Sequence, residues 1–397
     1  MNKLIQYLIL GSLATGAFNE CRSQTFNPVS SLDYCVSKVA LDTAMIKEMD
    51  GMPRTIDGNK TDWQFARIGD WTNGFFPGIL WFAYEYTGDP VWKREADRVT
   101  WALAPIAFRN NFDHDLGFIL YNSFGKGYRL TGDTAYKRIL LASADSLATL
   151  FNPRVGTILS WPGMRQRMGW PHNTIVDNMM NLELLFWAAR NGGSRRLYDI
   201  AMKHAETTMQ NHFRPDYSAY HVVVYDTVTG KRIKGVTVQG YSDSSMWARG
   251  QSWAIYGFTM CYRETRDARF LNFAQKVAGI YLKRLPVDRI PFWDFDDPSI
   301  PKAPRDASAA AIAASALLEL SGYVKDPSLA RYYRSQAEAM LSSLSAAPYR
   351  SGNQNRAFLL HSTGNKPSGG EIDASIIYAD YYYMEALLRL KHLQLGP

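Results

Sequence analysis

Tyr86-Thr-Gly-Asp-Pro-Val-Trp92 recurs in altered form along the chain, and the architecture follows from that repetition. In these copies a glycine or short polar run can end one helix, and an Asp or Ser side chain can cap the next. Such a turn joins two antiparallel helices into a hairpin. The further copies are Leu130–Tyr136, Arg190–Tyr198, Thr265–Phe270 and Val324–Leu329.

Apolar residues spaced three and four apart between these turns predict a chain that is helical almost throughout. Hairpins that recur in this way bury their apolar faces by stacking side by side. Six of them closing into a ring give an all-α (α/α)6 barrel; an open α-solenoid is the alternative, and the uneven spacing of the turns argues against it. We expect twelve helices, at Leu32–Met49, Thr72–Thr87, Pro90–Arg109, Phe118–Thr131, Thr134–Phe151, Ile175–Asn191, Arg195–Phe213, Met246–Thr265, Ala268–Lys283, Ala307–Tyr323, Pro327–Leu344 and Ile372–Lys391.

Long inserts precede the first helix of a hairpin, so in a barrel they would meet at one end and form the functional mouth. In one of them, Tyr220–Arg232 predicts a β-hairpin that turns at Thr229-Gly230, the only strand pair that we expect. No low-complexity linker divides the chain, so we expect a single barrel domain over residues 25–397. The inserts are Asp62–Asp70, Phe151–Thr174, Arg214–Ser245, Asp288–Asp306 and Tyr349–Glu371.

Residues 1–24 have the pattern of a bacterial export signal, in which Lys3 precedes a short apolar run that ends in small residues. The run is too short to cross a bilayer, and no other segment is apolar enough to do so. We therefore expect a soluble, exported, periplasmic protein. Cys21 as a lipid-modified first residue is the alternative, which Asn19-Glu20 fits poorly.

The chain of 397 residues has a formal net charge of +7, which suits an acidic partner. Its Lys and Arg residues are scattered and no nucleic-acid motif is present, so the expected partner is an acidic small molecule or polysaccharide. Cys21, Cys35 and Cys261 provide neither a disulfide framework nor a cysteine-rich metal site. We expect a monomer or a weak dimer.

The stretch Gly235–Gly257 combines polar and aromatic residues where a helix begins. Asp243–Ser245 are the expected N-cap of this helix. Arg249 and Trp253 are four residues apart, which places a guanidinium beside an indole as a floor for an anionic ring. In the simpler interpretation Arg249 makes a structural ion pair and Trp253 is core. With Gln239 close by, the stretch is too polar for core and too aromatic for a solvated face, which favours a binding site.

Two aspartates are the candidate acid/base pair. Asp115 precedes a helix and Asp177 lies in the first turn of another, so both would face the mouth of a barrel. An acid at a helix N-terminus can simply complement the helix dipole. The flanking Asn178 and Asn181, however, form a polar patch rather than a solvated charged face. If the two acids approach each other, repulsion and desolvation raise one pKa, so that one carboxyl carries a proton at neutral pH.

Histidines and tryptophans complete the candidate site. His114, beside Asp115, would tune or cap the acidic pair, and His221 would lie over the same mouth, although a lone histidine is more often structural. Trp71 and Trp161 at loop and helix starts have the pattern of a carbohydrate platform, although many aromatic residues will be core. No histidine pair, phosphate loop or nucleophile elbow is present, so we expect an acid/base enzyme with neither metal nor cofactor.

At these residues the sequence resembles the unsaturated glucuronyl hydrolases of glycoside hydrolase family 88, and the similarity covers nearly the whole mature chain. This family has an (α/α)6 barrel and acts on oligosaccharides whose non-reducing end is a C4=C5 unsaturated uronic acid. The motifs that carry the resemblance are Asp70–Phe75, His114–Phe118, Asp177–Asn181, Gln239–Trp253 and Tyr378–Tyr382.

The resemblance implies a role for each candidate. Asp177 would be the general acid/base that hydrates the vinyl ether, and Asp115 its carboxylate partner. The subsite for the unsaturated uronate would be lined by Trp71, His221, Gln239, Arg249 and Trp253.

Two positions bear on specificity. Val238 departs from the family pattern, where a histidine is frequent, and Lys366 lies in a loop that in some relatives reads sulfate. The expected substrates are therefore unsaturated oligosaccharides, glycosaminoglycan fragments first. The alternatives are an unsaturated rhamnogalacturonyl hydrolase acting on pectin fragments and a non-catalytic binder of acidic oligosaccharides.

Overall fold

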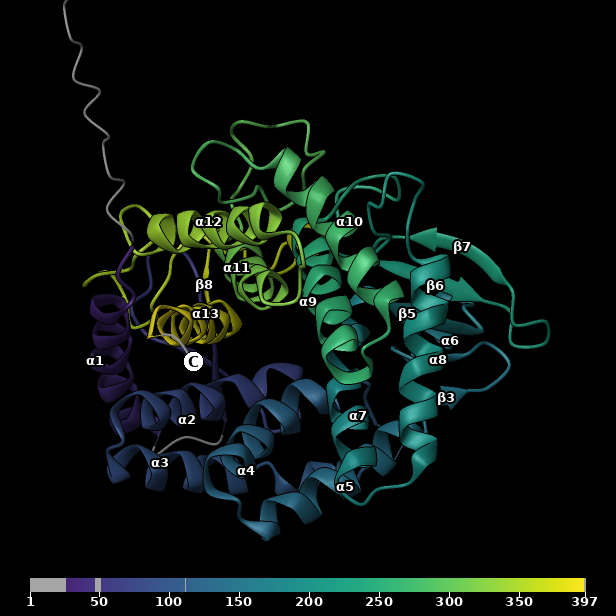
Figure 1. Ribbon diagram of the computed structural model, residues 1–397, viewed down its shortest axis with the longest axis horizontal. Helices are drawn as coiled ribbons and strands as arrows, with labels where there is room; N and C mark the ends of the chain where they lie inside the picture. Colours follow the sequence, from purple (N-terminus) through teal and green to yellow (C-terminus); the bar gives the residue numbers. More distant parts are fainter. Residues whose placement is uncertain (1–25, 47–50, 111, 396–397) are drawn as a thin grey trace, which may run out of the picture.

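The computed structural model describes residues 26–46, 51–110 and 112–395; the expected export signal and Cys21 lie outside this part of the chain. Its helices pair into hairpins that close into a ring (Figure 1), as the repeated turns predict. The last inner helix, α13 (Ile377–Leu395), packs against both α11 (Ala307–Ser321) and the first inner helix, α2 (Phe75–Thr87). This contact closes the barrel and excludes the open solenoid.

Six inner segments line the barrel and six helices surround them. The remaining inner segments are a π-helix (Gly117–Gly125) that continues as α4 (Lys126–Thr131), a 3-10 helix (Val176–Asn181) that continues as α7 (Leu182–Arg190), and α9 (Ala248–Thr265). The outer helices are α1 (Val29–Ile46), α3 (Pro90–Trp101), α5 (Thr134–Ala148), α8 (Arg195–Asn211), α10 (Ala268–Arg284) and α12 (Pro327–Leu344). All twelve predicted helices are therefore present; short α6 (Met164–Met168) was not predicted.

The hairpin turns have the predicted chemistry. Gly88 ends α2 with φ of 70°, in the region that favours glycine, and the Asp89 carboxylate accepts the backbone N–H of Val91 to cap α3. Gly132 and Asp133 repeat this arrangement between α4 and α5. The sequence motif thus fixes the angle at which each outer helix leaves its inner partner.

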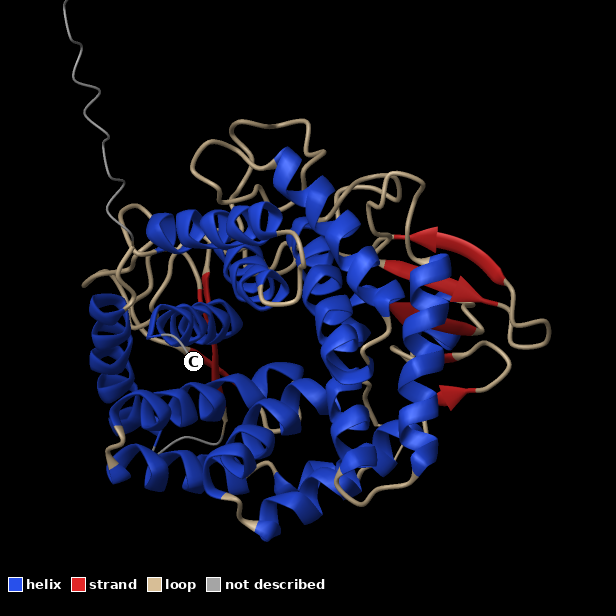
Figure 2. Ribbon diagram, in the orientation of Figure 1, coloured by secondary structure: helices blue, strands red, loops and turns tan. Residues whose placement is uncertain are grey.

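The prediction of a single strand pair is wrong. Among the described residues, three small sheets lie in the segments that connect the helices; Figure 2 shows most of their strands together at the right edge of the ring, and the predicted hairpin forms two strands of one sheet. The other strands have only two to five residues, too few to show a local alternation, and the β1–β8 and β5–β6 pairs also join strands that are distant in sequence. The sheets are β2 (Gln64–Ala66), β1 (Met52–Ile56) and β8 (Ser375–Ile376); β3 (Phe151–Asn152) and β4 (Thr157–Ile158); and β5 (His172–Ile175), β6 (Val222–Tyr225) and β7 (Arg232–Val236).

Two inner segments start irregularly where they meet. The π-helix brings Gly117 against Asn181 at the end of the 3-10 helix, and a Cβ on Gly117 would lie 2.6 Å from the Asn181 Cα atom. Only glycine permits this approach. Because Asp115 and Asp177 immediately precede these two contact points, the close packing carries both acids to the same place.

The start of α9 corrects another prediction. Its N-cap is Trp247, whose side chain caps nothing, so the expected capping by Asp243–Ser245 is wrong. Those side chains stabilise the preceding loop instead: Asp243 accepts the N–H of Thr237, and Ser245 donates to Asp294. Within the described ranges, no helix has the length and hydropathy needed to cross a membrane.

Candidate active site

A narrow cavity at the loop-covered end of the barrel collects most of the predicted site residues. Its volume is about 70 Å³, and its walls come from the 3-10 helix, the π-helix, α9 and the intervening loops. Both candidate acids line it, so the structure brings together the pair that the sequence suggested. The lining residues are Trp71, Asp115, Phe118, Trp161, Ile175, Asp177, Gln239 and Arg249.

Asp177 lies in the first turn of the 3-10 helix with little exposure. Burial raises the pKa of its carboxyl to about 6, although the Arg249 and His114 charges and the Trp253 indole lower it. One of its oxygens, Oδ2, is buried and has no hydrogen-bond partner among the residues that the structure describes. A buried carboxyl with a free oxygen and a pKa near neutrality can both give and take a proton.

Asp115 is held between an amide and an imidazole. The Asn181 amide donates to Asp115 Oδ1 over 3.1 Å, and the Asn181 carbonyl oxygen accepts the N–H of Phe118, which fixes the orientation of the amide. His114 Nε2 lies 3.3 Å from the same carboxylate oxygen, and its Nδ1 lies 2.9 Å from Asp113. Burial raises the pKa of Asp115 above its usual range. This carboxyl is therefore rigidly placed at the cavity wall.

His114 is a buried cation in this arrangement. Burial alone would lower its pKa, but the charges of Asp115 and Asp113 outweigh that effect and raise the pKa to about 9. Among the described residues, Asp113, His114 and Asp115 are the only group whose possible ligand atoms are close enough to hold a metal, within 4.8 Å of one another. Metal binding would have to displace the protons that this raised pKa keeps on the imidazole, so these residues fit an ion poorly.

His221 is buried behind the cavity wall, next to Asp177, and stays neutral. Its Nδ1 accepts the backbone N–H groups of Val238 and Gln239, both over 3.1 Å, so its proton must sit on Nε2. Nε2 lies 3.8 Å from Asp177 Oδ2. Burial and the nearby Arg249 charge lower the pKa of His221 to about 3. The imidazole is therefore a fixed N–H donor that faces the candidate acid.

Arg249 is almost completely buried and is held by the protein at both terminal nitrogens. Nη1 lies 3.3 Å from Asp306, and Nη2 donates to the Gly364 carbonyl over 2.6 Å. Nη2 also donates to Gln239 Oε1 over 3.3 Å, the longest of its bonds. The guanidinium is therefore a fixed positive charge beside Asp177, and Gln239 bonds to its Nη2 atom.

The aromatic residues divide into two groups. Trp71 and Trp161 are partly exposed and line the cavity. Trp253 is fully buried between Phe118 and Tyr382, so it presents no face on which a sugar ring could stack. The expected contact between Trp253 and the Arg249 guanidinium is replaced by two others. The guanidinium lies 4.7 Å from the Trp247 ring and 5.3 Å from the Tyr378 ring.

The remaining candidates lie outside the cavity. Lys366 Nζ is 3.1 Å from Asp297 and 4.8 Å from the Trp293 ring centre, so its charge is already neutralised. The Val238 side chain packs with the apolar cluster around Trp170. A role of Lys366 in reading sulfate stays a prediction.

Sequence reasoning missed the residues that hold Arg249. Asp306 caps α11 through the N–H of Ser308, and this capping position was the only available signal for it. The carbonyls of Thr363 and Gly364 leave no trace in side-chain chemistry. Backbone acceptors of this kind become visible only when the loop is placed.

A closed ring of helical hairpins, with two buried carboxyls and tryptophans in a narrow cavity at one end, defines a helical-barrel glycosidase that works by acid/base chemistry. Residues 41–396 match Glycosyl Hydrolase Family 88. The chain belongs to this family.

Relatives with an assigned activity are similar over most of their length. An unsaturated glucuronyl hydrolase of Formosa agariphila is 45% identical over 82% of this chain and 80% of its own. An unsaturated chondroitin disaccharide hydrolase of Streptococcus pneumoniae is 34% identical over 90% of each chain. The crystal structure of an unsaturated glucuronyl hydrolase specific for heparin matches with a TM-score of 0.87 and 42% identity, over 93% of this chain and 98% of that one.

Proposed function

We propose that the enzyme removes a C4=C5 unsaturated glucuronate from the non-reducing end of oligosaccharides that lyases release from glycosaminoglycans. The observation that carries this proposal is the buried Asp177 carboxyl, with a pKa near 6 and a free oxygen, beside a fixed cation. The names of the relatives in Formosa and Streptococcus support the substrate class.

The reaction starts with proton transfer to carbon. The protonated Asp177 carboxyl gives its proton to C4 of the vinyl ether, and positive charge develops at C5 and the ring oxygen. The Asp177 carboxylate left behind then takes a proton from water, whose oxygen adds to C5. The resulting hemiketal opens to a ketone, and the hemiacetal freed at C1 expels the shorter sugar. One carboxyl thus serves as acid and then as base, and no group attacks the anomeric carbon.

The surrounding residues orient the substrate and the water. His221 Nε2–H, 3.8 Å from Asp177 Oδ2, is placed to bind the attacking water or a substrate oxygen. Asp115, held by Asn181, accepts hydrogen bonds from ring hydroxyls. Trp71 and Trp161 supply the apolar walls against which a flattened ring packs.

Recognition of the uronate carboxylate falls to Arg249. Its Nη2–H bond to Gln239 is long, at 3.3 Å, and its acceptor is a neutral side-chain amide, so the substrate carboxylate exchanges with the Gln239 oxygen while the other bonds keep the guanidinium in place. The freed Gln239 amide can then contact the sugar.

The test is the ultraviolet absorbance of the conjugated double bond, which disappears on hydration. Unsaturated disaccharides from chondroitin, hyaluronan, heparin and ulvan should be offered together with an unsaturated rhamnogalacturonyl disaccharide. We expect loss of absorbance with at least one glycosaminoglycan disaccharide. Activity on the pectin fragment alone would favour the rhamnogalacturonyl alternative, and binding without any loss of absorbance would leave only the non-catalytic one.

We also propose that the enzyme is exported to the periplasm, as an unanchored monomer or weak dimer. The basic and then apolar pattern of residues 1–24 supports export. Fractionation of expressing cells and the mass of the mature protein test it. A cytoplasmic protein that keeps Met1 would contradict export, and a lipid mass on Cys21 would contradict the unanchored form.

A further inference from the structure

Two segments next to the active-site cavity carry positive charge without any acid. Between Phe151 and Thr174 the charged residues are Arg154, Arg165 and Arg167, and between Thr227 and Ser242 they are Lys231, Arg232 and Lys234. No Asp or Glu occurs in either segment. In the sequence these cations are dispersed among more than forty in the chain, and Asp226 and Asp243 flank the second segment. The Asp226 backbone N–H donates to the Lys231 carbonyl over 2.9 Å, and the Asp226 carboxylate accepts the N–H groups of Val228 and Thr229, so this acid belongs to the turn.

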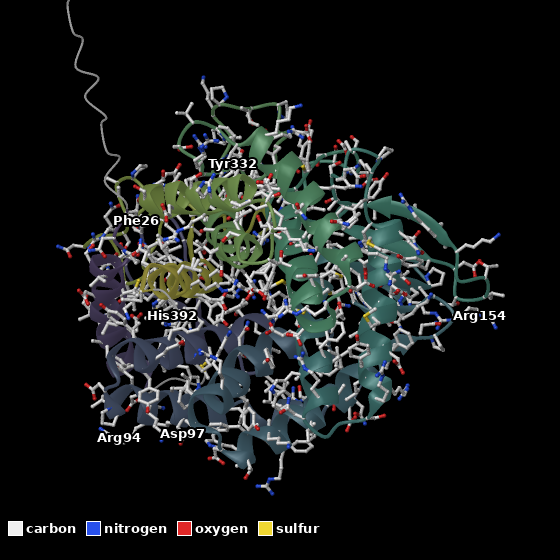
Figure 3. The ribbon with its side chains drawn as sticks, in the orientation of Figure 1. Phe26, Arg94, Asp97, Arg154, Tyr332 and His392 are labelled. Carbon is white, nitrogen blue, oxygen red and sulfur yellow. The ribbon has the colours of Figure 1, made fainter. Side chains whose placement is uncertain are left out.

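The fold places these segments side by side. Strand β5 of the first pairs with β6, which in turn pairs with β7 of the second, and all three lie beside α6 in Figure 1. The two turns also touch, because a Cβ on Gly230 would lie 2.2 Å from the Arg154 carbonyl oxygen. Figure 3 shows Arg154 at the tip of this projection. The six cations therefore gather on neighbouring elements: Arg232 and Lys234 on β7, Lys231 in the turn before it, Arg154 in the turn between β3 and β4, and Arg165 and Arg167 on α6.

Five of the six are free to meet an anion. Arg232 donates to the Asn211 carbonyl and lies over the Tyr220 ring. Lys234 Nζ lies 5.6 Å from the Trp170 ring, and no ion pair in the described ranges involves it. The same holds for the exposed side chains of Arg154, Arg165, Arg167 and Lys231. We call these five residues the basic strip: Arg154, Arg165, Arg167, Lys231 and Lys234.

The basic strip continues from the cavity wall. Trp161 and Gln239 line the cavity. Trp161, Met164 and Val238 pack against the same apolar cluster as Trp170, over which Lys234 lies. Residues in a strand rise by about 3.3 Å each, so Lys234 is at most about 17 Å from Gln239 along the chain. That span corresponds to the sugars that follow the cleaved uronate. By contrast, Lys366 on the opposite loop is paired with Asp297.

We propose that the basic strip binds the reducing-end portion of a sulfated oligosaccharide, beyond the sugar that bears the leaving oxygen. This inference rests on the proposed function, because it names the longer, sulfated members of that substrate class. Unpaired guanidinium and ammonium groups on an exposed sheet attract sulfate through charge and hydrogen bonds, and salt screens this attraction. The strip therefore acts on capture of long sulfated chains and leaves the chemical step at Asp177 unchanged.

The experiment compares chain length and sulfation in one variant. Arg165→Gln, Arg167→Gln and Lys234→Gln are combined, and kcat/KM is measured on an unsaturated disaccharide, an unsulfated hyaluronan hexasaccharide and a sulfated chondroitin hexasaccharide. The matched control combines Lys93→Gln, Arg94→Gln and Arg138→Gln, which removes the same charge from unpaired residues of α3 and α5; Arg94 lies on the opposite side of the molecule in Figure 3.

We expect the strip variant to lose roughly ten- to a hundredfold in kcat/KM on the sulfated hexasaccharide, mainly through KM, with the loss shrinking as salt is added. The disaccharide should be turned over as before, and the control should match the parent. An equal loss on all three substrates, no loss on any, or the same loss in the control would overturn the proposal. A loss on both hexasaccharides alike would mean that the strip reads uronate carboxylates rather than sulfate, which also contradicts it.

Failure of the proposed function is distinguishable. If the parent enzyme left every unsaturated disaccharide unchanged, that function would be wrong. The strip would still be judged by calorimetric titration with the sulfated hexasaccharide, where parent and control must bind more tightly than the strip variant.

Discussion

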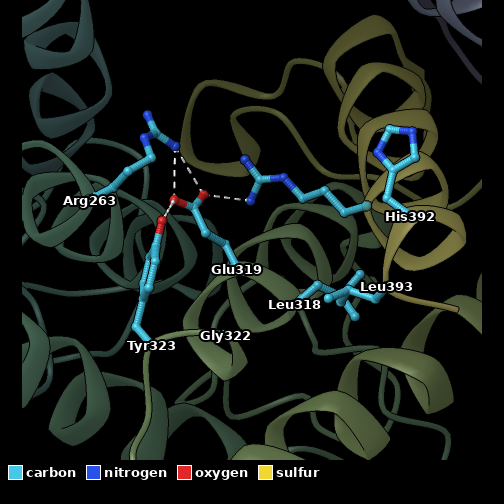
Figure 4. A pocket seen from close by; sticks show the side chains of 8 residues that line it. Arg263, Leu318, Glu319, Gly322, Tyr323, His392 and Leu393 are labelled. Carbon is cyan, nitrogen blue, oxygen red and sulfur yellow. Dashed lines mark hydrogen bonds and ion pairs between the residues drawn. The ribbon is translucent and has the colours of Figure 1, made fainter. Parts of the chain in front are cut away.

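The two ends of the barrel both hold buried charges, but they use them in opposite ways. At the end away from the loops, a cavity of about 610 Å³ is lined by Arg263, Glu319, Tyr323, Arg389 and His392 with neighbouring apolar residues (Figure 4). It is far larger than the 70 Å³ cavity that holds Asp115 and Asp177. Size alone would select the wrong end as the active site.

Pairing separates the two ends. Glu319 accepts from Arg263 over 2.9 Å and lies 2.8 Å from Arg389, while Glu385 lies 3.2 Å from Lys126 and accepts from Ser315 over 2.7 Å. Burial would raise the pKa of Glu385, but the Arg389 and Lys126 charges lower it to about 2. At the mouth, burial prevails and raises the pKa of Asp177 to about 6. A paired acid stabilises the fold, whereas an acid left without its own cation can move protons.

The largest expected effect is on catalysis at the mouth. Asp177→Asn removes the proton that the proposed mechanism gives to C4, so the rate of absorbance loss should fall by roughly 10² to 10⁴. The folded pKa of about 6 lies above the ordinary 3.8, so ionisation of Asp177 costs stability as pH rises from about 4 to about 6. The variant should therefore melt no lower than the parent at pH 7, and any gain in Tm should shrink toward pH 4.

The matched control is Asp199→Asn, an exposed acid on α8, which should change neither rate nor Tm. If Asp177→Asn kept the parental rate, Asp177 would not be the acid. A large fall in the Tm of Asp177→Asn at pH 7 would mean that the Asp177 carboxylate stabilises the fold through an ion pair, as Glu319 and Glu385 do.

The second effect is on stability at the far end. Glu385→Gln leaves Lys126 and Arg389 without their shared carboxylate, and breaking a buried pair of this kind costs about 3 kcal/mol. Its pKa of about 2 lies below the ordinary 4.5, so its stabilising effect is present above about pH 4.5 and is lost as pH falls toward 2.

Urea denaturation of Glu385→Gln at pH 7 and pH 3 measures both statements. The loss of stability should be smaller at pH 3 than at pH 7. The sign is opposite to that for Asp177→Asn, which should gain stability at pH 7 and lose this gain toward pH 4. The kcat of the folded fraction should stay parental. If Glu385→Gln folded normally and lost its activity, the active site would lie at the end of the barrel with the larger cavity, and its assignment to the smaller cavity would be wrong.

Sequence reasoning went furthest where chemistry is local. The Thr-Gly-Asp turns have the predicted cap, since Asp89 accepts the N–H of Val91 at the start of the next helix, and the structure adds a bond from the N–H of Asp89 to Thr87 Oγ1. The (α/α)6 barrel follows from such turns, and the contact of Gly117 with Asn181 then brings Asp115 and Asp177 to one cavity.

What the sequence could not supply are partners brought from far away. Lys366 is neutralised by an aspartate 69 positions before it, and Arg249 is fixed by carbonyls more than a hundred positions after it. The same limit explains Trp253: helical spacing places it beside Arg249, but Phe118 of the π-helix and Tyr382 of α13, both distant in sequence, bury it. Dispersed cations of the basic strip also become one surface only through the β5–β6–β7 sheet.

A third effect is the pH dependence of the reaction. Asp177 must carry a proton before it meets C4, so kcat/KM should fall above pH 6 by about tenfold per pH unit. Glu385→Gln changes a charge at the other end of the barrel, so the kcat/KM of its folded fraction should show the same fall above pH 6, which is the basic limb of the pH profile. A kcat/KM that stayed level to pH 8 would contradict protonation by Asp177 at this pKa.

The smallest effect isolates one neighbour of Asp177. The Trp253 indole lowers the pKa of that carboxyl, so Trp253→Phe should raise it and move the basic limb of kcat/KM to higher pH by less than about one unit. Loss of ring volume lowers stability by itself, and Trp81→Phe controls for this, because Trp81 is equally buried but donates its indole N–H to Thr100, away from the cavity. Both variants should lose Tm, and only Trp253→Phe should move the limb. A shift of equal size in both would mean that the limb reports on packing of the barrel rather than on the field at Asp177.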